Sequence, residues 1–125
     1  MTDAELEQFI ATNIHSVEEV EILTLLSRSP DTYWSADAMG QQLGIKAEVV
    51  GARARELLRR GLLAVGESGS VYRYAPTDEK TKEQVTVLTD TYRDRRITVI
   101  NAIYTANLTR LRSFADAFKL GGGKP

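Results

Sequence analysis

The stretch MGQQLGI at residues 39–45, with the run KAEVVGARARELLRRGLL at residues 46–63, decides the fold of this chain. Apolar residues spaced by three and four predict two helices here. The first is short and ends at Leu43, and the second covers Lys46–Arg60. Gly44 between them suits the left-handed residue that stops a helix. The stretch therefore predicts two helices joined by a tight turn.

The residues before this stretch predict two more helices and the start of the short one. Residues 3–14 carry apolar side chains near the 3.6-residue period of a helix. Ser16 followed by Glu19 matches a capping box, in which each side chain satisfies a free backbone donor of the other residue. The helix that it opens runs to about Arg28. Ser35 is a suitable N-cap for the short helix.

The residues after the second helix predict a β-hairpin. Residues 62–65 and residues 71–74 are short runs rich in apolar and aromatic side chains. Gly and Ser dominate residues 66–70 between them, which is typical of a turn. Tyr33 and Trp34 are expected to pack as a plug over the core.

The C-terminal part predicts further helices. One is expected to start at Thr77 or Thr81, and a second apolar run follows from Arg95. Asn107 is expected to cap a break in that run, and residues 121–125 to form a disordered tail. The predicted fold class is mainly α with a small β-hairpin.

The length of 125 residues suits one domain. Residues 1–76 are expected to form the helix-rich domain with its hairpin. Residues 77–120 are expected to form C-terminal helices that belong to the same compact unit and serve packing or dimerisation.

The central stretch resembles the helix-turn-helix and wing entry of a known group of proteins. Residues 39–45, the apolar positions Val50, Ala54 and Leu57, and Gly61-Leu62-Leu63 follow its pattern without a gap. The group is the winged helix-turn-helix transcriptional regulators, small bacterial proteins of the multiple-antibiotic-resistance and arsenic-repressor kind, and the likeness covers roughly residues 16–75. In that pattern the small Gly40 allows a close helix crossing.

The resemblance implies a winged helix-turn-helix with a C-terminal helical extension, and double-stranded DNA as the partner. The helix Lys46–Arg60 would enter the major groove, and the hairpin turn at residues 66–70 would touch the backbone or minor groove. The residues expected to contact DNA, mostly at phosphates, are Lys46, Arg53, Arg55, Arg59 and Arg73.

The early outward positions of the second helix lack side chains suited to base edges; they are Ala47, Glu48, Val49, Gly51 and Ala52. Two functions therefore stay open. The first is a small DNA-binding regulator that acts as a homodimer. The second is a winged-helix protein–protein interaction module without DNA binding.

An apolar stripe in the C-terminal helices predicts a dimer interface, because its spacing follows a heptad seam. The expected dimerisation residues are Ile97, Ile100, Tyr104, Leu108, Leu111 and Phe118. The alternative is that this helix packs on the N-terminal helix of its own chain.

The net charge of −1 conceals an uneven distribution. Residues 1–43 hold one basic and eight acidic side chains, whereas residues 44–75 and residues 76–125 each have a net charge of +3. Either folding separates two electrostatic faces or the charges are scattered over a solvated surface. Two interpretations of the cluster Arg93–Arg96 stay open: contact with phosphate or an acidic partner surface, or a solvated helix junction.

The composition excludes several classes of function. With no cysteine there is no disulfide, thiol nucleophile or Cys-type zinc site, and His15 is the only histidine. No apolar run approaches the ~18–20 residues of a membrane span, and the acidic N-terminus does not resemble a signal peptide. We expect a cytoplasmic protein that is not an enzyme, has no cofactor or metal, and uses His15 structurally.

Overall fold

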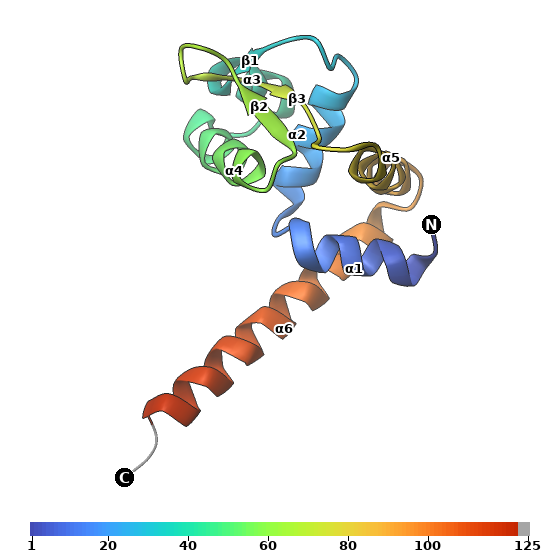
Figure 1. Ribbon diagram of the computed structural model, residues 1–125, viewed down its shortest axis with the longest axis vertical. Helices are drawn as coiled ribbons and strands as arrows, with labels where there is room; N and C mark the ends of the chain where they lie inside the picture. The colour runs from blue at the N-terminus through green and yellow to red at the C-terminus, as the bar shows by residue number, and fades with distance from the viewer. Residues whose placement is uncertain (123–125) are drawn as a thin grey trace.

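The computed structural model describes residues 1–122 of the chain, with side chains for residues 1–118. Over these residues the chain forms six helices and a three-stranded antiparallel sheet (Figure 1). In chain order the elements are α1 (Asp3–Asn13), α2 (Val17–Ser27), β1 (Trp34–Ser35), α3 (Ala36–Leu43), α4 (Ala47–Arg59), β2 (Leu63–Val65), β3 (Val71–Tyr74), α5 (Glu79–Asp94) and α6 (Arg96–Gly122). The mainly helical fold class with a small β element is confirmed.

Side-chain caps fix where the first two helices begin. At α1, Glu5 N donates to Thr2 Oγ1 over 3.1 Å and Thr2 N donates to Glu5 Oε1 over 2.9 Å, which is a full capping box. At α2, Ser16 Oγ accepts from Glu19 N, as predicted. The predicted second hydrogen bond of the box, from Ser16 N to the Glu19 carboxylate, is wrong, because this carboxylate accepts from His15 N instead. This carboxylate belongs to a buried ion pair described below.

The turn between α3 and α4 follows the sequence prediction. Ser35 Oγ caps α3 by accepting from Ala38 N, and Gly44 ends the helix in the left-handed conformation at φ +69°. A Cβ on Gly40 would lie 2.6 Å from the carbonyl oxygen of Ile45. The absence of a side chain at Gly40 is therefore what lets α3 lie so close to the turn into α4.

The sheet has one strand more than the predicted hairpin. β3 lies between β2 and β1, with Leu63 opposite Tyr74 and Trp34 opposite Tyr72. The expectation that Tyr33 and Trp34 pack over the core is confirmed for Trp34, which is half-buried against the core, and is wrong for Tyr33, which is 48% exposed. A two-residue strand shows no alternating pattern, so only its pairing with β3 identifies it.

One hydrophobic core connects the helices and the sheet. α2 lies between α4 and α5, and its residues Val20, Ile22, Leu23 and Leu26 are fully buried (Figure 1). The same cluster of buried residues includes members of α1 and α6. The N-terminal and C-terminal parts therefore share one core.

The two C-terminal helices differ from the prediction at their boundaries. α5 is capped by Asp78, whose Oδ1 accepts from Thr81 N over 2.7 Å, so a start at Thr77 or Thr81 is wrong. α6 continues through Asn107, so the expected break there is also wrong. The Asn107 side chain does not interrupt its own helix, because its Nδ2 donates to the carbonyl oxygen of His15 over 3.0 Å.

α6 extends far beyond the rest of the fold (Figure 1). Its first half packs against α1 and α5, whereas residues 111–118 are all exposed. Of the tail expected at 121–125, residues 121 and 122 continue the helix, and residues 123–125 lie outside the described part of the chain.

Candidate nucleic-acid interface

α4 presents a polar outer side because its apolar residues face the core. Val50, Ala54 and Leu57 are fully buried at spacings of three and four. The opposite side carries Glu48, Ala52, Arg55 and Arg59, which recur at the same spacings. The helix is thus strongly amphipathic, with its charged side available to a partner.

Three of the predicted DNA-contacting residues are exposed on α4 or at its start. Lys46 is the N-cap residue, and Arg55 and Arg59 lie on the outer side. Arg59 pairs with Glu56 over 3.0 Å but remains 75% exposed. Within residues 1–118, Lys46 and Arg55 form no ion pair. These cations are the ones most available for a phosphate.

Arg53 is less available than its neighbours. Its Nε lies 3.8 Å from Glu18 Oε1, and its side chain is 41% exposed. The Nε atom itself is buried and makes no hydrogen bond to the described residues. Arg53 therefore lies at the edge of the outer side, partly committed to α2.

Arg73 lies on β3, away from the outer side of α4. Its Nε donates to the Tyr33 hydroxyl over 3.2 Å, and its guanidinium lies 5.7 Å from the centroid of the Tyr33 ring. The hairpin turn beyond it carries Glu67 and no basic residue. Arg73 therefore belongs to the sheet, where it contacts Tyr33, and not to the row of arginines on α4.

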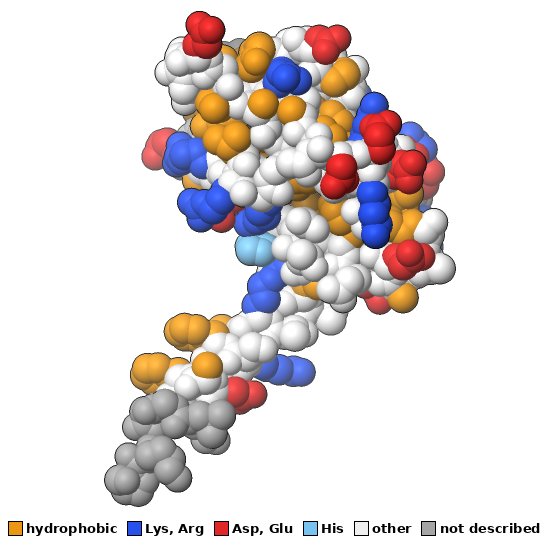
Figure 2. Space-filling model, viewed as in Figure 1, with side chains coloured by type: hydrophobic (Ala, Val, Ile, Leu, Met, Phe, Trp, Pro, Cys, Tyr) orange, Lys and Arg blue, Asp and Glu red, His pale blue; other side chains and the backbone are white. Residues whose placement is uncertain are grey.

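Lys and Arg side chains gather on the flank of the molecule that α4 forms, with acidic side chains among them (Figure 2). A shallow depression of about 330 Å³ lies on this flank. The residues lining it are His15, Glu19, Ala52, Arg53, Arg55, Glu56, Arg59 and Arg60. Basic and acidic side chains are therefore mixed in this depression, and Glu19 and Arg60 are the most buried of its charged side chains.

Arg60 anchors the end of α4 to the loop between α1 and α2. Its Nη1 donates to Glu19 Oε1 over 3.0 Å and to the carbonyl oxygen of Asn13 over 2.7 Å. Its Nη2 donates to His15 Nδ1 over 3.0 Å and to Glu56 Oε1 over 3.3 Å. The Arg60 and Glu19 side chains are only 14% and 1% exposed. The sequence predicts Arg60 only as the last residue of the helix, and no local pattern identifies it as a buried ion-pair partner.

A second arginine holds the same loop from the side of α6. Arg110 Nη1 donates to Asn107 Oδ1, and Asn107 in turn donates to the carbonyl oxygen of His15. Arg110 Nη2 donates to three carbonyl oxygens at the end of α1, those of Ile10, Ala11 and Ile14. The Ile10 carbonyl also accepts from Ile14 N, and the contacts to Ala11 and Ile14 supply donors to carbonyl groups beyond it at the end of the helix.

His15 lies between these two arginines. Burial, and then the positive charges of Arg60 and Arg110, lower the pKa of His15 below its usual value of 6.5. The neutral ring is the form that accepts the hydrogen bond from Arg60. The geometry thus supplies a hydrogen-bonding role for His15 in the joint between helices.

The apolar stripe of α6 is largely exposed. Of the expected dimerisation residues, Ile97, Tyr104, Leu111 and Phe118 are 62–75% exposed, and Phe114 beside them is 69% exposed. Ile100 and Leu108, the other two expected residues, are half-buried. A different side of α6, with Val99, Ile103 and Ala106, packs on the core and on α1. One side of α6 therefore packs on the N-terminal helix of its own chain, and another side of the same helix stays exposed and apolar.

The basic side chains at the junction of α5 and α6 already contact acidic or aromatic side chains. Arg93 donates to Asp94 over 2.9 Å, and Arg95 lies 3.5 Å from Asp3. The Arg96 guanidinium lies 4.5 Å from the centroid of the Tyr92 ring. These partners favour a solvated helix junction over a separate phosphate site.

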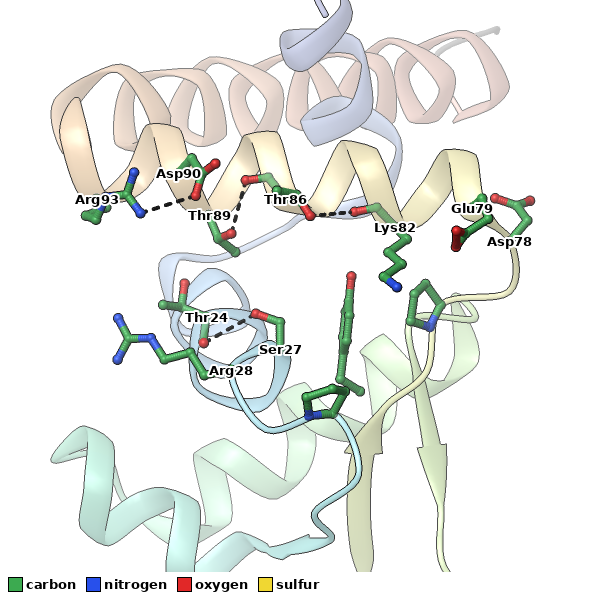
Figure 3. Close-up of a pocket in the computed structure, with 13 residues that line it drawn as sticks. Thr24, Ser27, Arg28, Asp78, Glu79, Lys82, Thr86, Thr89, Asp90 and Arg93 are labelled. Carbon is green, nitrogen blue, oxygen red and sulfur yellow. Dashed lines mark hydrogen bonds and ion pairs between the residues drawn. The ribbon is translucent and has the colours of Figure 1, made fainter.

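A larger cavity of about 510 Å³ lies between α2, the end of β3 and α5 (Figure 3). Its hydroxyl groups on Thr24, Thr86 and Thr89 donate to carbonyl oxygens of their own helices. Its charged side chains are three cations and three acids, namely Arg28, Lys82, Arg93, Asp78, Glu79 and Asp90. The charges balance, so the cavity favours neither an anion nor a cation.

Neither a family model, nor a curated protein, nor a solved structure matches this chain. In the part of the chain that the structure describes, no group of three or more histidine and carboxylate side chains could hold a metal ion. None of the described helices combines the length and the apolarity needed to cross a membrane.

Proposed function

We propose that this protein is a small DNA-binding transcriptional regulator built on a winged helix-turn-helix, and that it acts as a homodimer. The order α3, turn at Gly44, α4 and then the β2–β3 hairpin supports this assignment. In such a domain α4 is the recognition helix that enters the major groove, and the hairpin lies beside it as the wing.

The observation that carries the proposal is the row of exposed cations on α4. Arg55 and Arg59 project from the outer side, and Lys46 stands at the start of the helix. Phosphate contacts of this kind supply most of the affinity of a DNA-binding protein and make it depend on salt. The segment therefore offers a backbone-binding surface despite the net charge of the chain.

The same surface predicts weak discrimination between DNA sequences. Glu48 and Ala52 occupy early outward positions of α4, where base-reading side chains are expected. Glu56 forms ion pairs with Arg59 and Arg60, which compete with phosphate contacts. We infer that affinity comes mainly from the phosphate backbone, with direct base contacts limited to arginine.

The test is a fluorescence anisotropy titration with a labelled random duplex at low salt and at several salt concentrations. The double variant Arg55→Ala with Arg59→Ala is expected to weaken binding at least tenfold and to lower the salt slope by about 2, roughly 1 for each lost phosphate contact. The control Arg28→Ala removes an exposed arginine beside the cavity between α2 and α5 and leaves binding unchanged. No binding at ~100 μM protein, or equal losses in both variants, would overturn the proposal.

A protein–protein interaction module is the second candidate, and the acidic and apolar residues on the outer side of α4 favour it. Glu48 is exposed and Val49 is half-exposed beside it. Under this function, Val49→Asp abolishes capture of a protein partner and DNA binding is absent. DNA binding that survives Val49→Asp and is lost with the arginines excludes this candidate.

A further inference from the structure

We propose that α6 pairs with α6 of a second copy of this chain in antiparallel orientation, with the crossing point near residues 107 and 108. This inference rests on the proposed homodimer and specifies how the dimer is built. In this dimer the exposed stripe of α6 packs against the same stripe of the second copy.

The stripe has the spacing of a helix-pairing seam. Ile97, Tyr104, Leu111 and Phe118 recur every seven residues, and Phe114 lies between the last two on the same side. All five side chains are more than 60% exposed. Single exposed apolar residues are common, but a continuous row along one helix marks an interaction surface.

The area of the stripe suits a second copy. An aromatic side chain can bury about 150–250 Å², and Tyr104, Phe114 and Phe118 expose 63%, 69% and 75% of their surface. These three rings therefore offer roughly 300–500 Å² before the aliphatic residues are added. A standard interface buries about 800 Å² on each partner, which the complete stripe approaches.

The projecting half of α6 also needs a partner to be stable. Residues 111–118 are exposed on every side and receive no support from the rest of the fold. Most of the stability of a helix in a protein comes from packing of its apolar side, and this segment has no such packing within its own chain. By contrast, Val99 and Ile103 hold the first half of α6 firmly on the core.

Antiparallel pairing places each unsupported half of α6 on the supported half of its partner. Parallel pairing would instead leave the two unsupported halves resting only on each other. The orientation that gives each projecting half a firm base is therefore the antiparallel one.

Side-chain size gives a second, independent argument for this orientation. The midpoint of the stripe lies between residues 107 and 108, so an antiparallel pair matches residues equally distant from it. The pairs that result are Ile97 with Phe118 and Tyr104 with Leu111. In both pairs an aromatic ring meets an aliphatic side chain, which lets the two rows interdigitate. A parallel pair would set every aromatic ring against its own copy.

Cysteine cross-linking tests the orientation cleanly, because the chain contains no cysteine. Leu108→Cys is expected to form a disulfide with its own copy, since a disulfide needs Cα atoms within about 7 Å. Phe118→Cys is not expected to do so, because the rise of 1.5 Å per residue puts the two copies roughly 30 Å apart. A mixture of Ile97→Cys and tagged Phe118→Cys protein is expected to give the mixed dimer.

Thr105→Cys is the matched control, because Thr105 is exposed on α6 but lines a groove with α1 away from the stripe. It is expected to form no disulfide. Efficient self-linking of Phe118→Cys, with no mixed product, would show parallel pairing and overturn the inference while the homodimer stands. A monomer at ~100 μM in light scattering would overturn both. DNA binding is measured separately, so its absence leaves the orientation test intact.

Discussion

Replacing Arg60 by alanine is expected to be one of the most damaging single changes at a charged position. The substitution removes the cation that lies 3.0 Å from Glu19 Oε1, and the Glu19 side chain is only 1% exposed in the folded chain. It also removes the donor to the carbonyl oxygen of Asn13. The second oxygen of Glu19, Oε2, already has no hydrogen-bond partner among the described residues.

Breaking a buried ion pair by removing one partner costs about 3–5 kcal/mol, because a charge stays buried without compensation. For a chain of this size, each kcal/mol lowers the melting temperature by roughly 3–5 °C. Arg60→Ala should therefore lower the melting temperature by roughly 10–20 °C. Arg59→Ala, at a residue 75% exposed on the same helix, should change the free energy of unfolding by at most ~1 kcal/mol.

Urea unfolding followed by circular dichroism measures the free energy of unfolding of both variants in one buffer, and a thermal melt gives the change in melting temperature. The double variant Glu19→Leu with Arg60→Met removes both charges, and it should recover at least half of the loss caused by Arg60→Ala. The reasoning fails if Arg60→Ala costs no more than Arg59→Ala. It also fails if the double variant is less stable than Arg60→Ala, because the buried charge would then not be the cause.

Three further changes have defined outcomes. Gly40→Ala places a Cβ 2.6 Å from a backbone carbonyl oxygen and should destabilise by ~2 kcal/mol or more in thermal melts, exceeding the strain of about 1 kcal/mol at Gly44→Ala. Arg110→Ala uncaps the end of α1 and should cost about 1.5–3 kcal/mol in urea, whereas Arg112→Ala should cost nearly nothing. The pKa of His15 is lowered in the folded chain, so its contribution to stability is complete above pH 6.5 and is lost as the pH falls toward the folded pKa. An NMR titration of this single histidine should give a pKa below 6.5, and a higher value would contradict the arrangement.

The local parts of the fold were predictable because their causes lie in neighbouring residues. Gly44 stops α3 and Ser35 caps it through contacts made within four residues. The burial of Val50, Ala54 and Leu57 follows from the helical period alone. The exposure of three of the cations on α4 follows from the same period.

The long-range parts could not be predicted, because their causes lie far apart in the chain. Glu19 meets Arg60 and Asn107 meets the His15 carbonyl only after the chain has folded. The pairing of Trp34 with Tyr72 has no local signature either. For the candidate site, the predicted residues stay a prediction, and only the folded chain shows that Arg53 lies beside Glu18 and that Arg73 contacts Tyr33.

The hydrogen bonds around the α1–α2 loop, which we call the joint, connect the helix proposed to bind DNA, α4, with the helix proposed to form the dimer, α6. Arg60 at the end of α4 holds this loop from one side, and Arg110 of α6 holds it from the other. The loop is therefore hydrogen-bonded to both helices, over distances of 2.7–3.2 Å. If α6 pairs as proposed, the spacing between the two copies of α4 is set by this joint. Loosening it with Arg110→Ala should then weaken DNA binding without removing any cation from α4, and unchanged DNA binding in a folded, dimeric Arg110→Ala protein would refute that coupling.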